Sequence, residues 1–250
     1  MGRKRIRAFL VLTLLVVAMA AMLQAQIFRG RRGMVIYQNE PPPTEFVIAR
    51  WKYSNNGRID GAGWSHDYPQ AEQHISQILS EVLLLDVERM SYRIVELSDD
   101  EIFRHPFVYL SEPGEMELTA EEDENLRQYV DRGGFVMIDD FDGPAQLENL
   151  LSNLRRVFPD RDVFRLNINH EIFHVYFDID ALQVISPYNV GADAVFWGLN
   201  NKDGQLAIIM CHNNDVGTFW GDIDLANRPL KPSIESLRLG IDFVLYALTH

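Results

Sequence analysis

Three carboxylates stand close together just after an apolar run in the middle of the chain. The run is FVMI at 135–138, and Asp139, Asp140 and Asp142 follow it. Carboxylates this close repel one another unless a cation, a proton or hydrogen-bond donors offset their charge. A hard cation such as Ca²⁺ or Mg²⁺ suits them. The alternative is ordinary loop chemistry, in which Asp139 accepts bonds from loop N–H groups while the other two face water or cap the next helix.

A second group of candidate residues spells His-Glu-Ile-Phe-His. On a helix, His170 and His174 would lie one turn apart and hold Zn²⁺, and Glu171 would polarise the metal-bound water. The residues on either side favour turns and strands over a long helix. The third histidine and the glycine of a metzincin would fall on Asp180 and Phe177. We therefore favour a surface turn with His174 packed and keep a zinc hydrolase as the alternative.

Trp64 and His66 lie in a glycine-rich loop of the kind that often binds ligands. An exposed tryptophan there can stack on a sugar or peptide, and a buried one would plug the sheet edge. Asp215 follows the apolar run LAIIM and can reach the same side of the domain. These three residues are further ligand-binding candidates. No residue is assigned a catalytic role.

One unit of strand, loop, helix and strand positions the carboxylates, and it covers residues 107–143. Thr119 and Glu122 have the spacing of a capping box, which starts a helix, and Gly133-Gly134 ends it. In open parallel sheets ligands bind beyond the carboxyl ends of the strands. This rule gathers residues 111–116 and the three aspartates around one crevice.

Strands and helices alternate along the rest of the domain, which predicts an α/β layered sheet with helices on both faces. Residues 195–212 read as an added β-hairpin around an Asn201-Lys202-Asp203-Gly204 turn. The last helix, 233–249, is predicted to present Ile234, Leu237, Ile241, Leu245 and Leu248 to the core. The other predicted strands are 45–53, 91–97 and 163–168, and the other predicted helices begin at Asp67, at Ser98 with a single turn over 99–103, and at Pro144.

The chain begins with a basic cluster followed by an uncharged run, Ala8–Leu23, and the small residue Ala25. This is the pattern of a secretory signal peptide covering residues 1–25. Cleavage and an uncleaved anchor both remain open, and only an anchor would connect the protein to a membrane. Residues 26–43 end in three prolines and are predicted to form a spacer before a single domain at 44–250. We expect an exported protein, periplasmic or anchored facing the periplasm.

Charge excludes one class of partner. The chain has 23 lysines and arginines against 36 aspartates and glutamates, a net charge of −13. Removal of residues 1–25 would take away four positive charges and no negative ones, which gives the remaining chain a net charge of −17. Nucleic-acid binding needs clustered positive charge, so we expect none. The lone Cys211 cannot form a disulfide within the chain.

Several short motifs in this order resemble the bacterial domain-of-unknown-function 4159 family over nearly all of residues 45–250. The resemblance implies a flavodoxin-like fold similar to class I glutamine amidotransferases, whose nucleophilic cysteine sits on a sharp turn after a strand. Here that turn is 139–143 and has no thiol. The resemblance also implies envelope partners of von Willebrand A type. The motifs are Arg50–Tyr53, Trp64 with Asp67–Pro69, Phe103–Phe107 with Tyr109-Leu110, Gly133–Phe135 with Asp139-Asp140, His170 with Phe173, and Tyr246–Thr249.

From the residues and the resemblance together, we expect an exported binding or interaction module of the cell envelope. The alternative is a hydrolase that uses a carboxylate or metal site at the carboxyl ends of the strands.

Overall fold

The computed structural model describes residues 36, 38–56, 63–182, 193–226 and 228–250. The predicted signal peptide at 1–25 lies outside these residues. Contacts group residues 38–250 into one compact unit. Part of the predicted spacer belongs to this unit, because the side chains of Gln38 and Asn39 donate hydrogen bonds to the backbone carbonyls of Ile94 and Tyr92. Within the described part of the chain, no helix is both long and apolar enough to cross a membrane.

Seven strands of the described chain form one sheet in the order β2-β1-β3-β4-β7-β6-β5. The first five are parallel, and β6 and β5 are antiparallel. The parallel part has the strand order of flavodoxin-like sheets, which confirms the predicted α/β class. The strands are β1 Ile48–Lys52, β2 Tyr92–Glu96, β3 Phe107–Ser111, β4 Phe135–Phe141, β5 Phe164–Arg165, β6 Val195–Asn200 and β7 Leu206–His212.

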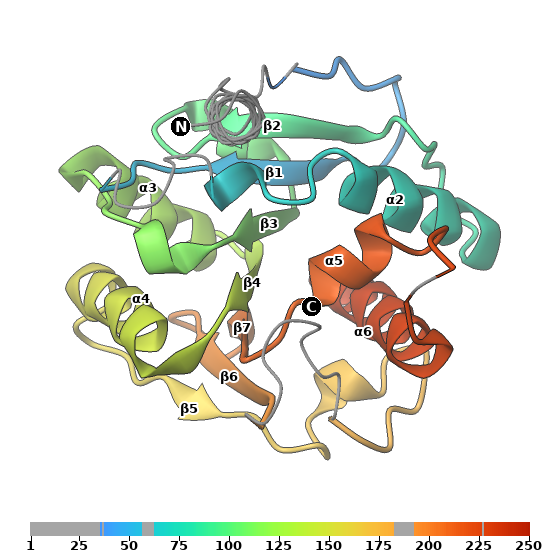
Figure 1. Ribbon diagram of the computed structural model, residues 1–250. Helices are drawn as coiled ribbons and strands as arrows, with labels where there is room; N and C mark the ends of the chain where they lie inside the picture. Colours follow the sequence, from blue (N-terminus) through green and yellow to red (C-terminus); the bar gives the residue numbers. More distant parts are fainter. Residues whose placement is uncertain (1–35, 37, 57–62, 183–192, 227) are drawn as a thin grey trace, which may run out of the picture. The chain divides into compact units, whose positions relative to one another are not determined.

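Helices cover both faces of the sheet. Figure 1 shows α3 and α4 on one face and α2, α5 and α6 on the other. The central strands are buried by both layers, and all five residues of β3 are buried. The α-helices are α2 Gln70–Val82, α3 Ala120–Asp131, α4 Gly143–Val157, α5 Val216–Gly221 and α6 Leu230–Thr249, and the single 3₁₀ turns are Gly63–Ser65, Asp100–Arg104, Pro113–Glu115 and Glu171–Phe173.

Several elements begin or end where local sequence signals predict. Thr119 Oγ1 accepts from Glu122 N at 3.2 Å, and Glu122 Oε2 accepts from Thr119 N at 2.8 Å, so the predicted capping box starts α3. Gly133, at φ 91°, follows its end. The hairpin is also confirmed, since β6 and β7 pair antiparallel around residues 201–205.

Several predicted caps and bounds differ from the structure; among them, α6 begins at Leu230 and not at the predicted Ser233. The side chain of Asp67 does not cap α2, because it accepts from Thr218 Oγ1 instead. The turn at 100–104 is capped by Asp99, not Ser98, through a bond from Glu101 N. The strand predicted over 163–168 shrinks to Phe164–Arg165 because only these two residues pair with β6.

Helix α6 buries a face that only partly matches the predicted one, since Ile241 is buried as predicted but two of the other predicted residues are exposed. Ile234 and Leu248 are exposed, at 45% and 36%, whereas Ser233, Ser236 and Gly240 are buried. A Cβ on Gly240 would lie 2.5 Å from the ring of Trp220, so the small residues let the helix approach α5 closely. Close backbone approach decided the orientation, and the larger side chains at 234 and 248 stayed outside.

Candidate functional site

Asp140 lies at the carboxyl ends of the parallel strands, where the sequence predicts a ligand-binding crevice. It lies near the end of β4, where the pairing with β7 shifts register between Ile138 and Phe141. Its Oδ2 lies 2.5 Å from Nδ1 of His66 and accepts from Ser111 Oγ at 3.4 Å. The hydrogen bond to Asp140 raises the pKa of His66 to about 9, so this imidazole is positively charged at neutral pH.

Two groups of metal-binding side chains share Asp140. One joins Asp140 to Asp67 and Asp215, and the other joins it to His66 and Glu112. In each group one ligand atom per residue lies within 4.8 Å of the others. Ca²⁺ binds oxygen at about 2.3–2.6 Å, so two ligands on opposite sides of it are about 5 Å apart. The three ligand atoms of either group can therefore surround one ion.

Asp215 provides a buried oxygen with no hydrogen-bond partner. Its side chain is the N-cap of α5, with Oδ1 accepting from Thr218 N at 3.0 Å, while Oδ2 is buried and has no partner. The residue as a whole is 1% exposed. Burial, reinforced by Asp140, raises the pKa of Asp215 well above its ordinary value. A buried carboxylate oxygen without a donor is unfavourable and needs an explanation, such as an ion.

Asp67 reaches the same point from the loop after β1. Its Oδ2 accepts from Thr218 Oγ1 at 2.6 Å, so Thr218 holds Asp67 and Asp215 beside each other. Burial raises the pKa of Asp67 as well. The sequence analysis placed Glu112 at the crevice within residues 111–116, but selected neither Glu112 nor Asp67 as a ligand-binding residue. A signal for Asp67 was present in the sequence, since it lies next to His66, a predicted ligand-binding residue.

Asp139 lies beneath the crevice. It is completely buried, and its Oδ2 accepts from Gly217 N at 2.7 Å and from Tyr109 Oη at 3.1 Å. Burial raises the pKa of Asp139 to about 7. Its contacts agree with the loop-chemistry interpretation, because they join β4 to the first turn of α5.

Asp142 occupies the N-cap position of α4 but makes no capping hydrogen bond through its side chain. Neither Asp139 nor Asp142 belongs to the two groups around Asp140. The structure therefore does not gather the three sequence-adjacent aspartates around one ion.

A buried arginine positions the loop that carries His66. Arg50, in the middle of β1, is 0% exposed and its Nε donates to Glu72 Oε1 at 2.5 Å. Its Nη1 donates to the carbonyl oxygens of His66 at 2.8 Å and Trp64 at 3.2 Å. The guanidinium also lies 4.2 Å from the centre of the Tyr109 ring. Sequence reasoning missed Arg50, although a charge inside an apolar strand was a usable signal.

Several residues at the carboxyl ends of the strands have a left-handed backbone conformation. The non-glycine residues with positive φ in the described chain are Asp67, Glu112, Asp140 and Asn213, at 54° to 60°. Each follows or ends a strand at the crevice. Tyr53 Oη supports one of them by donating to the carbonyl oxygens of Ser111 and Glu112. Such conformations cost free energy and often occur where a functional site requires them.

Trp64 is 8% exposed, so it is buried at the sheet edge and does not offer an open stacking surface. Lys52 Nζ lies 5.9 Å from the centre of its ring. Cys211 on β7 is also fully buried, and burial together with Asp139 raises the pKa of its thiol. A thiol that is buried and protonated does not act as a nucleophile.

The His-Glu-Ile-Phe-His segment forms a 3₁₀ turn, not an α-helix. His170 caps this turn by accepting from Ile172 N at 3.3 Å. Both ring nitrogens of His174 are engaged, with Asp178 Oδ1 at 2.5 Å and the Ile168 carbonyl at 2.7 Å. Among the described residues, neither group of three potential metal ligands includes His170, Glu171 or His174.

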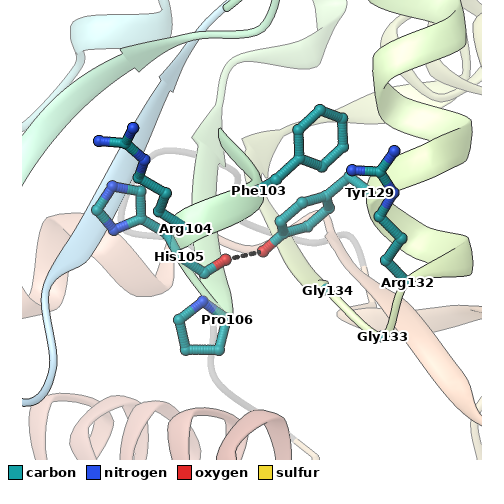
Figure 2. Close-up of a pocket in the computed structure, with 8 residues that line it drawn as sticks. All are labelled: Phe103, Arg104, His105, Pro106, Tyr129, Arg132, Gly133 and Gly134. Carbon is teal, nitrogen blue, oxygen red and sulfur yellow. Dashed lines mark hydrogen bonds between the residues drawn. The ribbon is translucent and has the colours of Figure 1, made fainter. Parts of the chain in front are cut away.

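At the opposite edge of the sheet, a pocket of about 270 Å³ lies between the loops that precede β3 and β4 (Figure 2). Tyr129 Oη crosses it and donates to the carbonyl oxygen of His105 at 2.8 Å. The Arg132 guanidinium lies 4.1 Å from the centre of the Phe103 ring. Figure 2 shows the guanidinium of Arg104 on the other side of the pocket, so the two arginines do not converge on one ligand. We interpret this pocket as a structural junction.

The strand order and the crevice at the strand ends define an α/β protein with a flavodoxin-like parallel sheet. Residues 47–248 match the family described as Domain of unknown function (DUF4159), and the chain belongs to this family. The match agrees with the resemblance drawn from the short motifs. A comparison with curated proteins found no match.

Proposed function

We propose that this protein is an exported binding module whose crevice binds a divalent cation, preferentially Ca²⁺, through Asp67, Asp140 and Asp215. One observation carries the proposal. Asp215 Oδ2 is buried without a hydrogen-bond partner, and the side chain belongs to a group of three carboxylates with ligand atoms within 4.8 Å. A cation at their centre would give this oxygen a partner that no described residue supplies.

Electrostatics favours a doubly charged ligand. At an effective dielectric constant of 20, two carboxylates 4.8 Å apart repel each other by about 3.5 kcal/mol. The charge on His66 compensates one of the three carboxylates, and the raised pKa values of Asp67 and Asp215 mean that, without a cation, these carboxyls bind protons more readily than usual. A divalent cation would neutralise two negative charges at once, and it is small enough to reach an oxygen that water does not reach.

Flexible coordination geometry favours Ca²⁺ over Mg²⁺. Mg²⁺ holds its ligands at about 2.0–2.1 Å, so opposite ligands must lie within about 4.2 Å. The ligand atoms of this group all lie within 4.8 Å of one another, and the flexible coordination of Ca²⁺ tolerates any spacing up to this limit, whereas Mg²⁺ demands near-ideal octahedral geometry. Three protein carboxylates leave positions for water or for an oxygen of a second molecule. Extracellular Ca²⁺ modules commonly bind with dissociation constants of about 10⁻⁴ to 10⁻³ M.

Export supports the choice of ion and of partner. The basic and apolar segments at the start of the chain are those of a secretion signal, and the acidic remainder suits a compartment rich in free cations. The family resemblance implies envelope proteins of von Willebrand A type as partners. We propose that the cation completes a surface to which such a protein binds.

Calorimetric titration of the EDTA-treated full-length protein with Ca²⁺ and Mg²⁺ tests the proposal. If Kd is about 10⁻⁴ M, 10 mM Ca²⁺ should add about 2.7 kcal/mol and raise Tm by about 5–10 °C. Asp215→Asn should abolish this increase while keeping the cap on Thr218 N, because asparagine retains an acceptor oxygen. Asp142→Asn, which changes an aspartate outside both groups, is the matched control and should keep it. No Ca²⁺ effect in the parent protein would refute the proposal.

A hydrolase is the second candidate function, and His66 is the observation that favours it. Its side chain is 49% exposed at the crevice and carries a proton at neutral pH beside the proposed cation. Such a group can donate a proton to a leaving group while the cation polarises the bond to be cleaved. Ca²⁺-dependent cleavage of phosphate or carboxylate esters, lost in His66→Gln, would establish this function. If the protein binds Ca²⁺ but cleaves no ester, the hydrolase is refuted and the binding module remains the proposed function.

A further inference from the structure

We propose that His66, Glu112 and Asp140 form a second metal position, one that takes a transition ion such as Zn²⁺ or Mn²⁺, and that Asp140 bridges it to the Ca²⁺ position. This inference rests on the proposed function, because Asp140 belongs to both sites. The three ligands come from three separate connections: the loop after β1, the loop after β3 and the end of β4.

The two groups differ in the chemistry of their ligands. The group of Asp67, Asp140 and Asp215 offers only carboxylate oxygens, which suit Ca²⁺ and Mg²⁺. The second group adds the Nδ1 nitrogen of His66. Imidazole nitrogen favours Zn²⁺ and other first-row transition ions, and carboxylates also suit Mn²⁺. Two positions with different ion preferences therefore lie side by side in one crevice.

Distances within the second group are close to those that a metal requires. His66 Nδ1 lies 3.8 Å from Glu112 Oε1 and 2.5 Å from Asp140 Oδ2. Zinc holds nitrogen and carboxylate oxygen at about 2.0–2.2 Å, so neighbouring ligands in a tetrahedral site lie about 3.4 Å apart. The distance between His66 and Glu112 already fits such a site, whereas the distance between His66 and Asp140 must lengthen by about 1 Å. An ion would thus replace the proton that His66 and Asp140 share.

His66 can make this movement without disturbing the core. Its ring is half exposed, whereas its backbone carbonyl is fixed by the buried guanidinium of Arg50 at 2.8 Å. Asp140 and Glu112 are less exposed, with side chains at 13% and 23%. The main chain is therefore held in place and only the imidazole needs to turn. The shared Asp140 would give each ion one oxygen, as in two-metal centres, whose ions are about 3.5–4 Å apart.

Metal counting on the full-length protein tests the second position separately from the first. The EDTA-treated protein is dialysed against Ca²⁺, against Zn²⁺ and against both, and bound ions are measured by mass spectrometry. We expect one Ca²⁺ and one Zn²⁺ per chain with both ions present. His66→Gln should weaken Zn²⁺ binding by about tenfold or more and leave Ca²⁺ in place. Asp215→Asn should weaken Ca²⁺ binding and leave Zn²⁺ in place. Asp140→Asn should weaken the binding of both ions.

His174→Gln is the matched control, because His174 forms a histidine–aspartate pair of the same 2.5 Å length with Asp178 but belongs to neither group of three ligands. This variant should keep both ions. Circular dichroism and thermal unfolding establish that each variant folds. Binding of Ca²⁺ without Zn²⁺, or Zn²⁺ that is lost in His174→Gln or Asp215→Asn but not in His66→Gln, would overturn the second position and leave the first. Binding of neither ion would overturn both.

Discussion

Replacing Asp139 with asparagine should change how the stability of the domain depends on pH. Asp139 is fully buried beneath the crevice, and burial raises its pKa from 3.8 to about 7. Because the pKa is higher in the folded chain than in the unfolded chain, the protonated carboxyl stabilises the fold. This contribution is fully present below about pH 4 and is lost as the pH rises to about 7.

The difference of about 3 in pKa corresponds to about 4 kcal/mol, of which about 3 kcal/mol is lost between pH 4.5 and pH 8. Asparagine cannot ionise, and its carbonyl oxygen can still accept from Tyr109 Oη and Gly217 N. We expect the free energy of unfolding of Asp139→Asn, relative to the parent protein, to increase by about 3 kcal/mol over this range.

Urea unfolding at several pH values between 4.5 and 8, with EDTA present, measures this difference. The exposed aspartate Asp180 provides the control, and Asp180→Asn should follow the parent curve. Parallel curves for the parent protein and Asp139→Asn would refute the reasoning, because they would show that the buried carboxyl does not titrate with a raised pKa. If these parallel curves are also offset to lower stability in the variant, the geometry of the hydrogen bonds of Asp139 matters more than its charge.

The remaining predictions concern packing, capping and export. Thr119→Ala should lower the free energy of unfolding by about 1 kcal/mol because it removes half of the capping box, whereas Ser98→Ala, at a position that caps no helix, should change it little. Gly134→Ala should cost about 1–3 kcal/mol because its Cβ would lie 2.3 Å from the Tyr129 ring, and thermal unfolding that stays unchanged would contradict this packing. Cell fractionation with an alkaline wash should find the protein outside the cytoplasm, beginning near Gln26 if cleaved or at Met1 if anchored, and a soluble full-length cytoplasmic protein would contradict export.

Signals that act within a few residues predicted their structures well. The capping box of α3 and the β6–β7 hairpin each depend on neighbours in the sequence, so their chemistry is visible in the sequence itself. The alternation of strands and helices predicted the α/β sheet for the same reason. The 3₁₀ turn at Glu171–Phe173 also followed from local preference, which outweighed the apparent zinc motif.

Elements whose form depends on close packing were harder to predict. Helix α5 was missed because its sequence, VGTFWG, has two glycines and little helix propensity. It forms because Asp215 caps it and all six of its residues are buried. The buried face of α6 was predicted only in part, because the prediction followed the large side chains at helical spacing and passed over the small ones. Gly240 against Trp220 shows that close approach of the backbone decided the result.

The sequence by itself determined the α/β class, most of the strands and the presence of carboxylates at one edge of the sheet. Only the tertiary structure decided which carboxylates meet. Asp140 lies 74 residues from His66 in the sequence, and its side chain turns into the crevice while that of Asp139 turns beneath it. Neighbouring residues at the end of a strand point in different directions, so adjacency in the sequence grouped Asp139, Asp140 and Asp142, whereas folding grouped Asp140 with Asp67 and Asp215.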